Sequence, residues 1–430
     1  MKSGREKVLH EVAGAAMLAH VIASADGAGI GRKAVVLAPG MDQARALIEA
    51  QPGDIEVFVQ NEQCGTADAV LSARAALQDF EGDVIVLYGD TPLLRPQTLN
   101  ELKGALDDGA DVVVLGFESA DPTGYGRLVE DADGGLVAIR EDKDASASER
   151  AITMCNSGVM AFKGALVPGL LEQIGSDNAK GEFYLTDAVA LAREQGLRPV
   201  AVRCDEAETL GVNSRAELAR AEAIMQDRLR GAAMEAGATL VAPETVFLSI
   251  DTAIGRDVLI EPHVVLGGGV VLEEGATVRA FSHLEGAQVG RGAVVGPFAR
   301  LRPGAQIGPR ARIGNFVEVK NATFEEGAKA NHLSYVGDAQ VGARANIGAG
   351  TITCNYDGFD KHRTEIGEGA FIGSNSALVA PISIGKGAYI GSGSAITKNV
   401  ADDALAVTRA PQETREGWAA KVRKRRKRDK

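Results

Sequence analysis

The chain has 430 residues, which is too long for one ordinary hydrophobic core and predicts two or three domains. Hydrophobic residues make up 45% of the chain and aromatic residues only 4%, while 52 residues are glycine, a composition that suits a globular fold of tight, repeated turns. The net charge of −12 argues against a nucleic-acid-binding surface over most of the chain, because phosphate contacts need clustered Lys and Arg side chains.

The first part of the chain alternates short β-branched runs with helical patterns. Buried strands are predicted at residues 33–37, 55–59, 84–88 and 112–117. Helices are predicted between them at 41–49, 67–77 and 95–107. This order predicts a mostly parallel sheet in a Rossmann-like α/β domain. Ligands of such sheets bind beyond the carboxyl ends of the strands, so Asp90, directly after Tyr88 and Gly89, is expected beside a nucleotide or a metal ion.

A run rich in Ala, Leu, Glu and Arg follows, from Ser214 to Gly237. It begins with a serine suited to a helix N-cap and ends at a glycine, so it predicts one helix. We therefore expect an N-terminal domain at 1–213 and a linker helix at 214–238.

From Ile254 onward, aliphatic residues recur every six positions. The first series is Ile254, Ile260, Leu266, Leu272, Val278 and Leu284; after a slip of one residue it resumes at Val289, Val295, Leu301, Ile307, Ile313 and Val319, and a third series runs through Ile366, Ile372, Leu378, Ile384, Ile390 and Ile396. This period is typical of hexapeptide repeats, in which each aliphatic side chain enters the bore of a parallel β-helix and small residues form its corners. The coil of such repeats is left-handed, and we expect it to span 239–410.

Two segments rich in polar donors interrupt the predicted period, at Phe324–Tyr335 and Thr353–Arg363. An N-acetyl transfer needs a base with a pKa near 7, and histidine is the side chain whose ordinary pKa lies closest to it. His332 in the first segment is the candidate. A single histidine is more often a satisfied surface group, so the surrounding Lys-Ala-Asn-His-Leu-Ser-Tyr run on a solenoid carries the hypothesis.

The last residues, 411–430, contain the basic run Lys421–Arg428. We expect a solvated, disordered end rather than a nucleic-acid arm, because like charges repel and the run has no aromatic residue to stack on a base; binding of an anionic ligand stays open. The four cysteines form no CxxC pair, which indicates neither a zinc site nor a disulfide framework. No secretory leader or membrane-spanning run is seen, so a cytoplasmic protein is expected.

Four motifs in the second half carry a resemblance to a known family: Gly296–Gly304, Gly314–Lys320, His332–Tyr335 and Asn346–Gly358. With them the chain resembles, over nearly its whole length, the bifunctional N-acetylglucosamine-1-phosphate uridyltransferase/glucosamine-1-phosphate acetyltransferases. The resemblance implies that His332 is the catalytic base. The implied contacts to glucosamine 1-phosphate are Arg302, Lys320, Tyr335, Asn346 and Lys361. The implied acetyl-CoA residues are Ala349, Asn355, Tyr356, Ser374, Ser392 and Arg409. Because the family is trimeric, with sites completed by neighbouring subunits, a homotrimer is expected.

The resemblance extends to the first half. Gln60–Thr66 resembles the uracil-recognition loop, Tyr88–Asp90 the metal and sugar end of a strand, and Gly124–Arg127 part of the N-acetylglucosamine pocket. The implied residues for UTP and the UDP-sugar are Lys7, Gln60, Gly65, Thr66, Tyr88, Gly126, Glu141, Asn156 and Asn213. Asp90 and Asn213 are implied to hold Mg2+, a hard cation that nucleotidyl transfer needs to offset charge on the phosphates.

One departure from the family lies at the N-terminus. Members open with a strand and a glycine-rich loop, ending Gly-Thr-Arg-Met, that wraps the UTP triphosphate, whereas this chain begins Met1-Lys-Ser. We therefore expect this loop to be missing and uridyl transfer to be weaker than acetyl transfer.

The predicted function is acetylation of glucosamine 1-phosphate by acetyl-CoA, followed by transfer of UMP from UTP to give UDP-N-acetylglucosamine. Three alternatives stay open. They are an acetyltransferase with an inactive nucleotidyltransferase domain, a nucleotidyltransferase for another sugar with a regulatory solenoid, and a non-catalytic hexapeptide scaffold. The joint presence of Arg302, Lys320 and His332 speaks against the scaffold.

Overall fold

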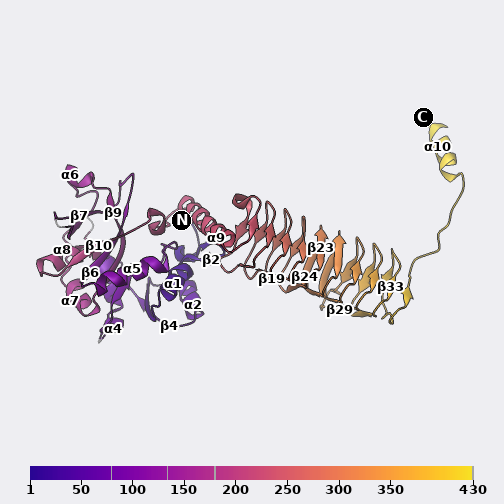
Figure 1. Cartoon of the computed structure of the whole chain (residues 1–430), viewed down its shortest axis with the longest axis horizontal. Helices are drawn as coiled ribbons and strands as arrows, with labels where there is room; N and C mark the ends of the chain where they lie inside the picture. Colours follow the sequence, from indigo (N-terminus) through magenta and orange to yellow (C-terminus); the bar gives the residue numbers. More distant parts are fainter. Residues whose placement is uncertain (79, 133, 179–180, 429–430) are drawn as a thin grey trace. The chain divides into compact units, whose positions relative to one another are not determined.

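The computed structural model describes residues 1–78, 80–132, 134–178 and 181–428. The chain divides into two compact units, Met1–Asp227 and Arg228–Lys430 (Figure 1). Each unit has its own hydrophobic core, and each is described by itself.

The sheet of the first unit is mixed rather than mostly parallel. In the described part of this unit, β5 (Val84–Val86), β6 (Val112–Glu118), β7 (Arg127–Glu130), β8 (Leu136–Arg140), β9 (Met154–Phe162) and β10 (Pro199–Cys204) form a six-stranded sheet. Strand β9 lies between β5 and β6 and runs antiparallel to both, while β6 and β10 are parallel. The predicted strands near 33–37 and 55–59 form a separate parallel pair, β3 (Arg32–Leu37) and β4 (Asp54–Val59).

The predicted helices of this unit are present with adjusted bounds. Helix α2 covers Asp42–Glu49 and α5 covers Pro96–Asp107, but the predicted helix at 67–77 is divided into α3 (Thr66–Ser72) and α4 (Arg74–Leu77). The other helices are α1 (Met17–Gly27), α6 (Ala147–Arg150), α7 (Val167–Leu171) and α8 (Ala188–Glu194), with a 3-10 turn η1 at Lys7–Leu9. Leucines of α5 recur at helical spacing and are buried against β6, which explains why the helix forms there.

The predicted linker helix is α9 (Arg215–Glu235). Its start is fixed by a capping box: the Glu217 N–H donates to the Ser214 hydroxyl at 3.2 Å, and the Glu217 carboxylate accepts from the Asn213 and Ser214 N–H groups at 2.7 Å each. The rigid start of α9 therefore also fixes Asn213.

The second unit is a parallel β-helix. Within its described residues one face is a ten-stranded sheet from β11 (Thr239–Leu240) to β35 (Leu405–Ala406). The other two faces join into a fifteen-stranded sheet through β24 (Glu318–Phe324) and β26 (Tyr335–Val341), which continue around a corner. Ile260 pairs with Val278, so one coil takes three hexapeptide units. These parallel sheets are consistent with the expected left-handed coil.

The bore of this helix contains the aliphatic residues that the period of six predicts. All of them lie in one continuous hydrophobic core, with Ile254 packed partly buried against its edge. Small residues four positions further on, such as Ala276, Ala299 and Ala311, are buried at the corners. The hexapeptide prediction is confirmed.

The predicted interruption at Phe324–Tyr335 is wrong. Strand β25 (Lys329–His332) continues the ten-stranded face without a gap, and Phe324, Ala330 and Val336 fill the bore in the normal order. The residues at 355–363, between β28 (Ile352–Cys354) and β29 (Thr364–Ile366), form a real insertion, with one isolated bridge between Tyr356 and Lys361.

The basic end of the chain is not a disordered run as expected. Helix α10 covers Trp418–Arg428, because Ala, Arg and Lys are strong helix formers. Across the described residues, none of the helices combines the length and the apolar character needed to cross a membrane.

Candidate functional sites

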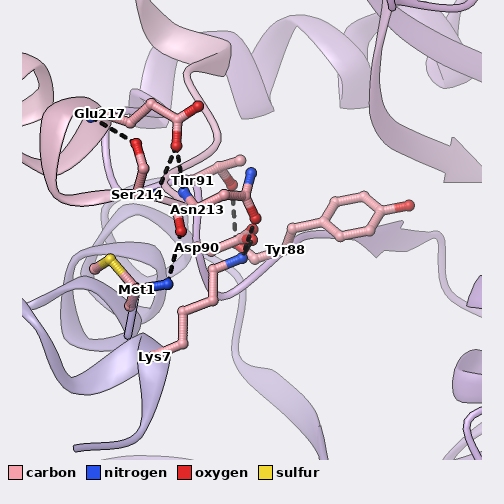
Figure 2. A network of polar contacts seen from close by, with 8 residues as sticks. All are labelled: Met1, Lys7, Tyr88, Asp90, Thr91, Asn213, Ser214 and Glu217. Atoms are coloured by element: carbon pink, nitrogen blue, oxygen red, sulfur yellow. Dashed lines mark hydrogen bonds and ion pairs between the residues drawn. The ribbon is translucent and has the colours of Figure 1, made fainter. Parts of the chain in front are cut away.

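A polar cluster in the first unit brings together three of the predicted residues (Figure 2). Lys7 comes from η1, Asp90 from the loop after β5, and Asn213 from the segment before α9. The Lys7 ammonium donates to Asp90 Oδ2 and to Asn213 Oδ1, each at 2.5 Å. The Val212 N–H also donates to the Asp90 carbonyl at 3.0 Å, so the two oxygen-bearing segments are joined through their backbones.

These two oxygens fit a hard cation. A carboxylate and an amide oxygen converge on one positive group, the Lys7 ammonium, which stands here for a cation between them. The Lys7 and Asp90 side chains are 37% and 26% exposed, which leaves the cluster open to a ligand. No group of three or more His, Cys, Asp or Glu side chains suited to a metal is found in the described residues. Mg2+ needs few protein ligands when waters and phosphate oxygens complete its shell.

The predicted uracil loop is packed closely beneath the start of α3. The Gln60 amide donates to the Gly65 carbonyl at 3.1 Å, and the Thr66 hydroxyl accepts from the Leu185 N–H at 2.9 Å. Gly65 has φ +125°, and a Cβ there would come within 2.5 Å of the Phe183 carbonyl oxygen, so only glycine fits. The loop is thereby held in one conformation.

Tyr88 connects this loop to the cation cluster. Burial, and then the nearby Asp90 carboxylate, raise the pKa of the Tyr88 hydroxyl, which also has a side-chain hydrogen bond with Thr66. A Cβ on Gly158 would lie 3.0 Å from the Tyr88 ring, so the ring packs on β9 backbone.

The three residues predicted for the N-acetylglucosamine pocket also lie together. The Asn156 N–H donates to the Gly126 carbonyl at 2.7 Å, and a Cβ on Gly126 would lie 3.5 Å from the Glu141 carboxylate. The motif resemblance did not identify the support beneath them, an ion pair of 2.9 Å between the buried Arg127 and the half-buried Asp142. Arg127 follows Gly126 and Asp142 follows Glu141, so the pair fixes both pocket segments.

In the second unit His332 lies at the end of β25, beside Asn315 at the end of β23 (Arg312–Asn315), one coil earlier. His332 Nδ1 and Asn315 Oδ1 are 2.6 Å apart. An amide oxygen only accepts, so Nδ1 is the donor of this hydrogen bond, and in the neutral ring the lone pair is then on Nε2. The exposed imidazole is therefore set up as a base. Sequence reasoning missed Asn315, although it lies in the quoted Gly314–Lys320 motif.

The predicted phosphate cations gather on the face formed by β24 and β26. Lys320 is on β24, and Lys361 comes from the inserted loop. The neighbouring Lys320 ammonium lowers the pKa of Lys361, because a like charge close by disfavours the protonated form. Arg302 forms a 3.0 Å ion pair with Glu318 on the same face. Two adjacent lysines, Lys361 exposed and Lys320 half-buried, are suited to a doubly charged phosphate.

Tyr335 lies over a position without a side chain. It pairs with Glu318 in the register of β24 and β26, and a Cβ on Gly337 would come 2.4 Å from the Tyr335 hydroxyl. The glycine therefore allows the Tyr335 ring to lie flat along its strand. Asn346 is on β27 (Asn346–Ile347) of the ten-stranded face, a different face from that of the cations.

Four predicted acetyl-CoA residues form a row along one corner of the β-helix. The Asn375 N–H donates to the Ala349 carbonyl at 2.7 Å, the Gly393 N–H to the Ser374 carbonyl at 2.8 Å, and the Arg409 guanidinium to the Ser392 carbonyl at 2.7 Å. The row Ala349, Ser374, Ser392 and Arg409 thus climbs one coil at a time.

The remaining two acetyl-CoA residues are at the start of the inserted loop. Asn355 is buried and donates to Asp338, whereas Tyr356 is 60% exposed and its hydroxyl donates to the Gly358 carbonyl at 2.7 Å. The structure therefore gives Asn355 a role in holding the loop and leaves the Tyr356 ring accessible.

Comparison with known families places both units among transferases. Residues 1–152 match the MobA-like NTP transferase domain, and residues 286–321 and 363–398 match the bacterial transferase hexapeptide repeats. The fold and the two sites thus define a two-unit transferase.

The bifunctional protein GlmU of Azorhizobium caulinodans is 60% identical over 98% of this chain and 94% of its own length, and that of Xanthobacter autotrophicus has the same values. GlmU of a Bradyrhizobium strain is 57% identical over 98% of this chain and 94% of its own length. The chain belongs to the GlmU family. The prediction of a bifunctional acetyl- and uridyltransferase is confirmed over its alternatives, while the expected missing loop before Met1 stays a prediction.

Proposed function

We propose that the second unit acetylates glucosamine 1-phosphate with His332 as the base. The sugar phosphate binds to Lys320, Lys361 and Arg302, and Tyr335 and Asn346 orient the sugar. His332 Nε2 takes a proton from the sugar ammonium, and the freed amine attacks the thioester carbonyl of acetyl-CoA. A C–N bond forms, the C–S bond breaks, and the CoA thiolate leaves and is protonated. The observation that carries this assignment is the 2.6 Å contact of His332 Nδ1 with Asn315 Oδ1, which engages Nδ1 and leaves Nε2 as the ring nitrogen that can act as the base.

The same proposal places acetyl-CoA along the corner row of Ala349, Ser374, Ser392 and Arg409, with Asn355 and Tyr356 beside its acetyl end. The cations and Asn346 lie on different faces of one β-helix. A groove between the β-helices of two neighbouring subunits would present both kinds of face to one substrate. This supports a homotrimer whose subunits share each site. By function, we divide the chain into a uridyltransferase domain at 1–213, a linker helix at 214–238, an acetyltransferase domain at 239–410 and a basic tail at 411–430.

The first unit, in this proposal, transfers UMP from UTP to N-acetylglucosamine 1-phosphate. Gln60, Gly65 and Thr66 hold the uracil, and Gly126, Glu141 and Asn156 hold the acetylated sugar. The sugar phosphate oxygen attacks the α-phosphorus, the bond to the β-phosphate oxygen breaks, and pyrophosphate leaves. Asp90 and Asn213 would hold Mg2+, which offsets charge on the phosphates when bound. Beside the cation, Lys7 contacts the phosphates and Tyr88 contacts the sugar.

The two activities in one chain allow a sharp test. In the full chain, His332→Ala should lower the kcat of acetyl transfer by about a hundredfold or more, since it removes the general base. Uridyl transfer by the same preparation should keep its rate, and so serves as the internal control. Asp90→Asn and chelation of divalent cations should instead lower the rate of uridyl transfer and leave acetyl transfer unchanged. A folded His332→Ala protein that acetylates at the original rate would remove the assignment.

A further inference from the structure

The turn that carries Lys7 is anchored on both sides. On one side, the Glu6 carboxylate accepts hydrogen bonds from backbone N–H groups in the first turn of α2, including that of Ala44 at 2.9 Å. On the other side, His10 closes η1 and contacts Arg215, the first residue of α9, although the two residues are 205 positions apart in the chain. The position of Lys7 thus depends on two short tethers outside the cation cluster itself.

The contact of His10 with Arg215 has a defined direction. His10 Nδ1 and the Arg215 guanidinium are 3.2 Å apart, and a guanidinium only donates, so Nδ1 is the acceptor. Burial, followed by the charges of Arg215, Arg5 and the N-terminal ammonium, lowers the pKa of His10, with Glu11 acting against them. The ring is therefore neutral near pH 7 and carries its proton on Nε2.

Core stability does not explain an imidazole at this position. His10 is 5% exposed, and its Nε2–H has no hydrogen-bond partner among the residues described. Such an orphaned donor opposes folding, and an apolar ring of similar size would avoid that cost. Arg215 is exposed, so its guanidinium would be hydrated without His10. What the imidazole adds is its link to Arg215.

That link joins the two segments whose spacing matters for the cation cluster. Arg215 follows Asn213 by two residues, and the capping box at the start of α9 fixes both of them. His10 follows Lys7 by three residues within the same turn. The His10–Arg215 contact therefore helps to set the separation between the backbone of Lys7 and the oxygen of Asn213, together with the hydrogen bond that the N-terminal ammonium donates to the Asn213 carbonyl at 3.0 Å (Figure 2).

We propose that His10 is a positioning residue for uridyl transfer, which holds the Lys7 turn against α9 through Arg215. This inference rests on the proposed roles of Lys7, Asp90 and Asn213. In the structure the Lys7 ammonium lies between the two cluster oxygens, and it would have to leave this place if Asp90 and Asn213 held a cation. The His10–Arg215 contact would keep the backbone of Lys7 in place while its side chain moves, so that the ammonium stays within reach of the phosphates.

The test uses steady-state uridyl transfer by the full chain. His10→Phe should raise the KM for UTP roughly tenfold, a usual cost of losing a supporting contact behind a ligand-binding group, and should change kcat less. His10→Asn should restore most of the loss, because its amide oxygen accepts where Nδ1 does. Calorimetric titration with UTP and Mg2+ should show the same order of affinities, independently of turnover.

A double-mutant cycle separates positioning from a general structural effect. If His10 acts through Lys7, then His10→Phe should add less than about twofold to the loss caused by Lys7→Ala. Glu11→Gln is the matched control, since it breaks an exposed 2.9 Å pair with Arg5 in the same segment and removes a charge that opposes the neutral state of His10, so the His10–Arg215 contact is kept. Acetyl transfer should be unchanged in all variants and reports that the chain is folded.

The outcomes are distinguishable. An unchanged KM for UTP in His10→Phe, or a loss that adds fully to that of Lys7→Ala, overturns the role of His10 alone. A Lys7→Ala variant that binds UTP and Mg2+ as tightly as the unaltered chain, or an unaltered chain that binds neither, overturns the proposed first site and the inference with it.

Discussion

Asn315 is not among the residues proposed to contact a substrate, yet its replacement should impair acetyl transfer. The Asn315 amide oxygen, 2.6 Å from His332 Nδ1, fixes both the tautomer and the orientation of the ring. In Asn315→Ala the ring loses one hydrogen bond with a net value of about 1–1.5 kcal/mol, and its two tautomers become comparable in population. Together these effects predict a roughly tenfold to thirtyfold fall in kcat, with the KM for glucosamine 1-phosphate nearly constant.

The assay is acetyl transfer across a pH range with Asn315→Ala, Asn315→Asp and a control. Asn315→Asp keeps the acceptor but adds a negative charge, which favours a protonated partner, so the acidic limb of the kcat profile should move to higher pH. Thr323→Ala, on β24 rather than on β23 or β25, is the control and should leave both profiles unchanged. An Asn315→Ala enzyme with the original kcat, or an Asn315→Asp profile that does not move, would refute the reasoning.

Three further outcomes are expected. Phe324→Ala opens a cavity in the bore and should lower the free energy of unfolding by about 3–5 kcal/mol in urea titrations followed by circular dichroism, whereas a loss below about 1 kcal/mol would mean the coil collapses around the gap. Burial lowers the pKa of His20, whose Nε2 is 2.7 Å from the Val12 carbonyl oxygen, so the unfolded chain binds more protons as pH falls below 6.5. The first unit should then lose stability in pulse proteolysis on going from pH 7.5 to about pH 5.5, and His20→Gln should flatten this dependence. Gly337→Ala should displace the Tyr335 ring and raise the KM for glucosamine 1-phosphate in acetyl transfer, with uridyl transfer unchanged, and a normal KM would show that the ring has other room.

The β-helix was predictable because its physics is local. Each face of a coil needs one bore residue, so a missing or extra residue shows in the sequence as a slip. The apparent break after Val319 arose from such a slip, since Phe324 follows after five residues and Ala330 then fills the bore with a side chain that is not a typical aliphatic. The real insertion at 355–363 was found because no bore residue could be placed within it.

The sheet of the first unit was less predictable because its pairing is not local. Strand β9 (Met154–Phe162) carries Asn156, Ser157 and Gly158 in its middle, which interrupt the apolar run that marks a buried strand. Its position between β5 and β6 is decided by tertiary packing. Both neighbours then run antiparallel to it, which the alternation of strand and helix in the sequence did not indicate.

The candidate sites show the same difference between what is local in the sequence and what only the fold brings together. Residue types such as His332 and Lys320 were predicted from motifs, but the groups that orient them came only from the structure. Asn315 reaches His332 because one coil places it directly below, and His10 reaches Arg215 across 205 positions. A contact of this kind leaves no periodic signal, since each partner looks ordinary in its own segment.

The two sites meet phosphate chemistry with opposite charges, and the folds that hold them explain why. Strand β24 holds Lys320 beside Lys361 of the inserted loop, so like charges are kept together, which suits the phosphate contact proposed for them. Loops of the first unit instead bring together two oxygens, Asp90 Oδ2 and Asn213 Oδ1. These oxygens would repel a triphosphate unless a cation lay between them and the phosphates. Lys7 supplies that cation in the structure, and its single charge is too small to balance a triphosphate. The proposed binding of a triphosphate at the first site therefore calls for a dication, whereas the proposed phosphate site of the second unit already has two lysines side by side.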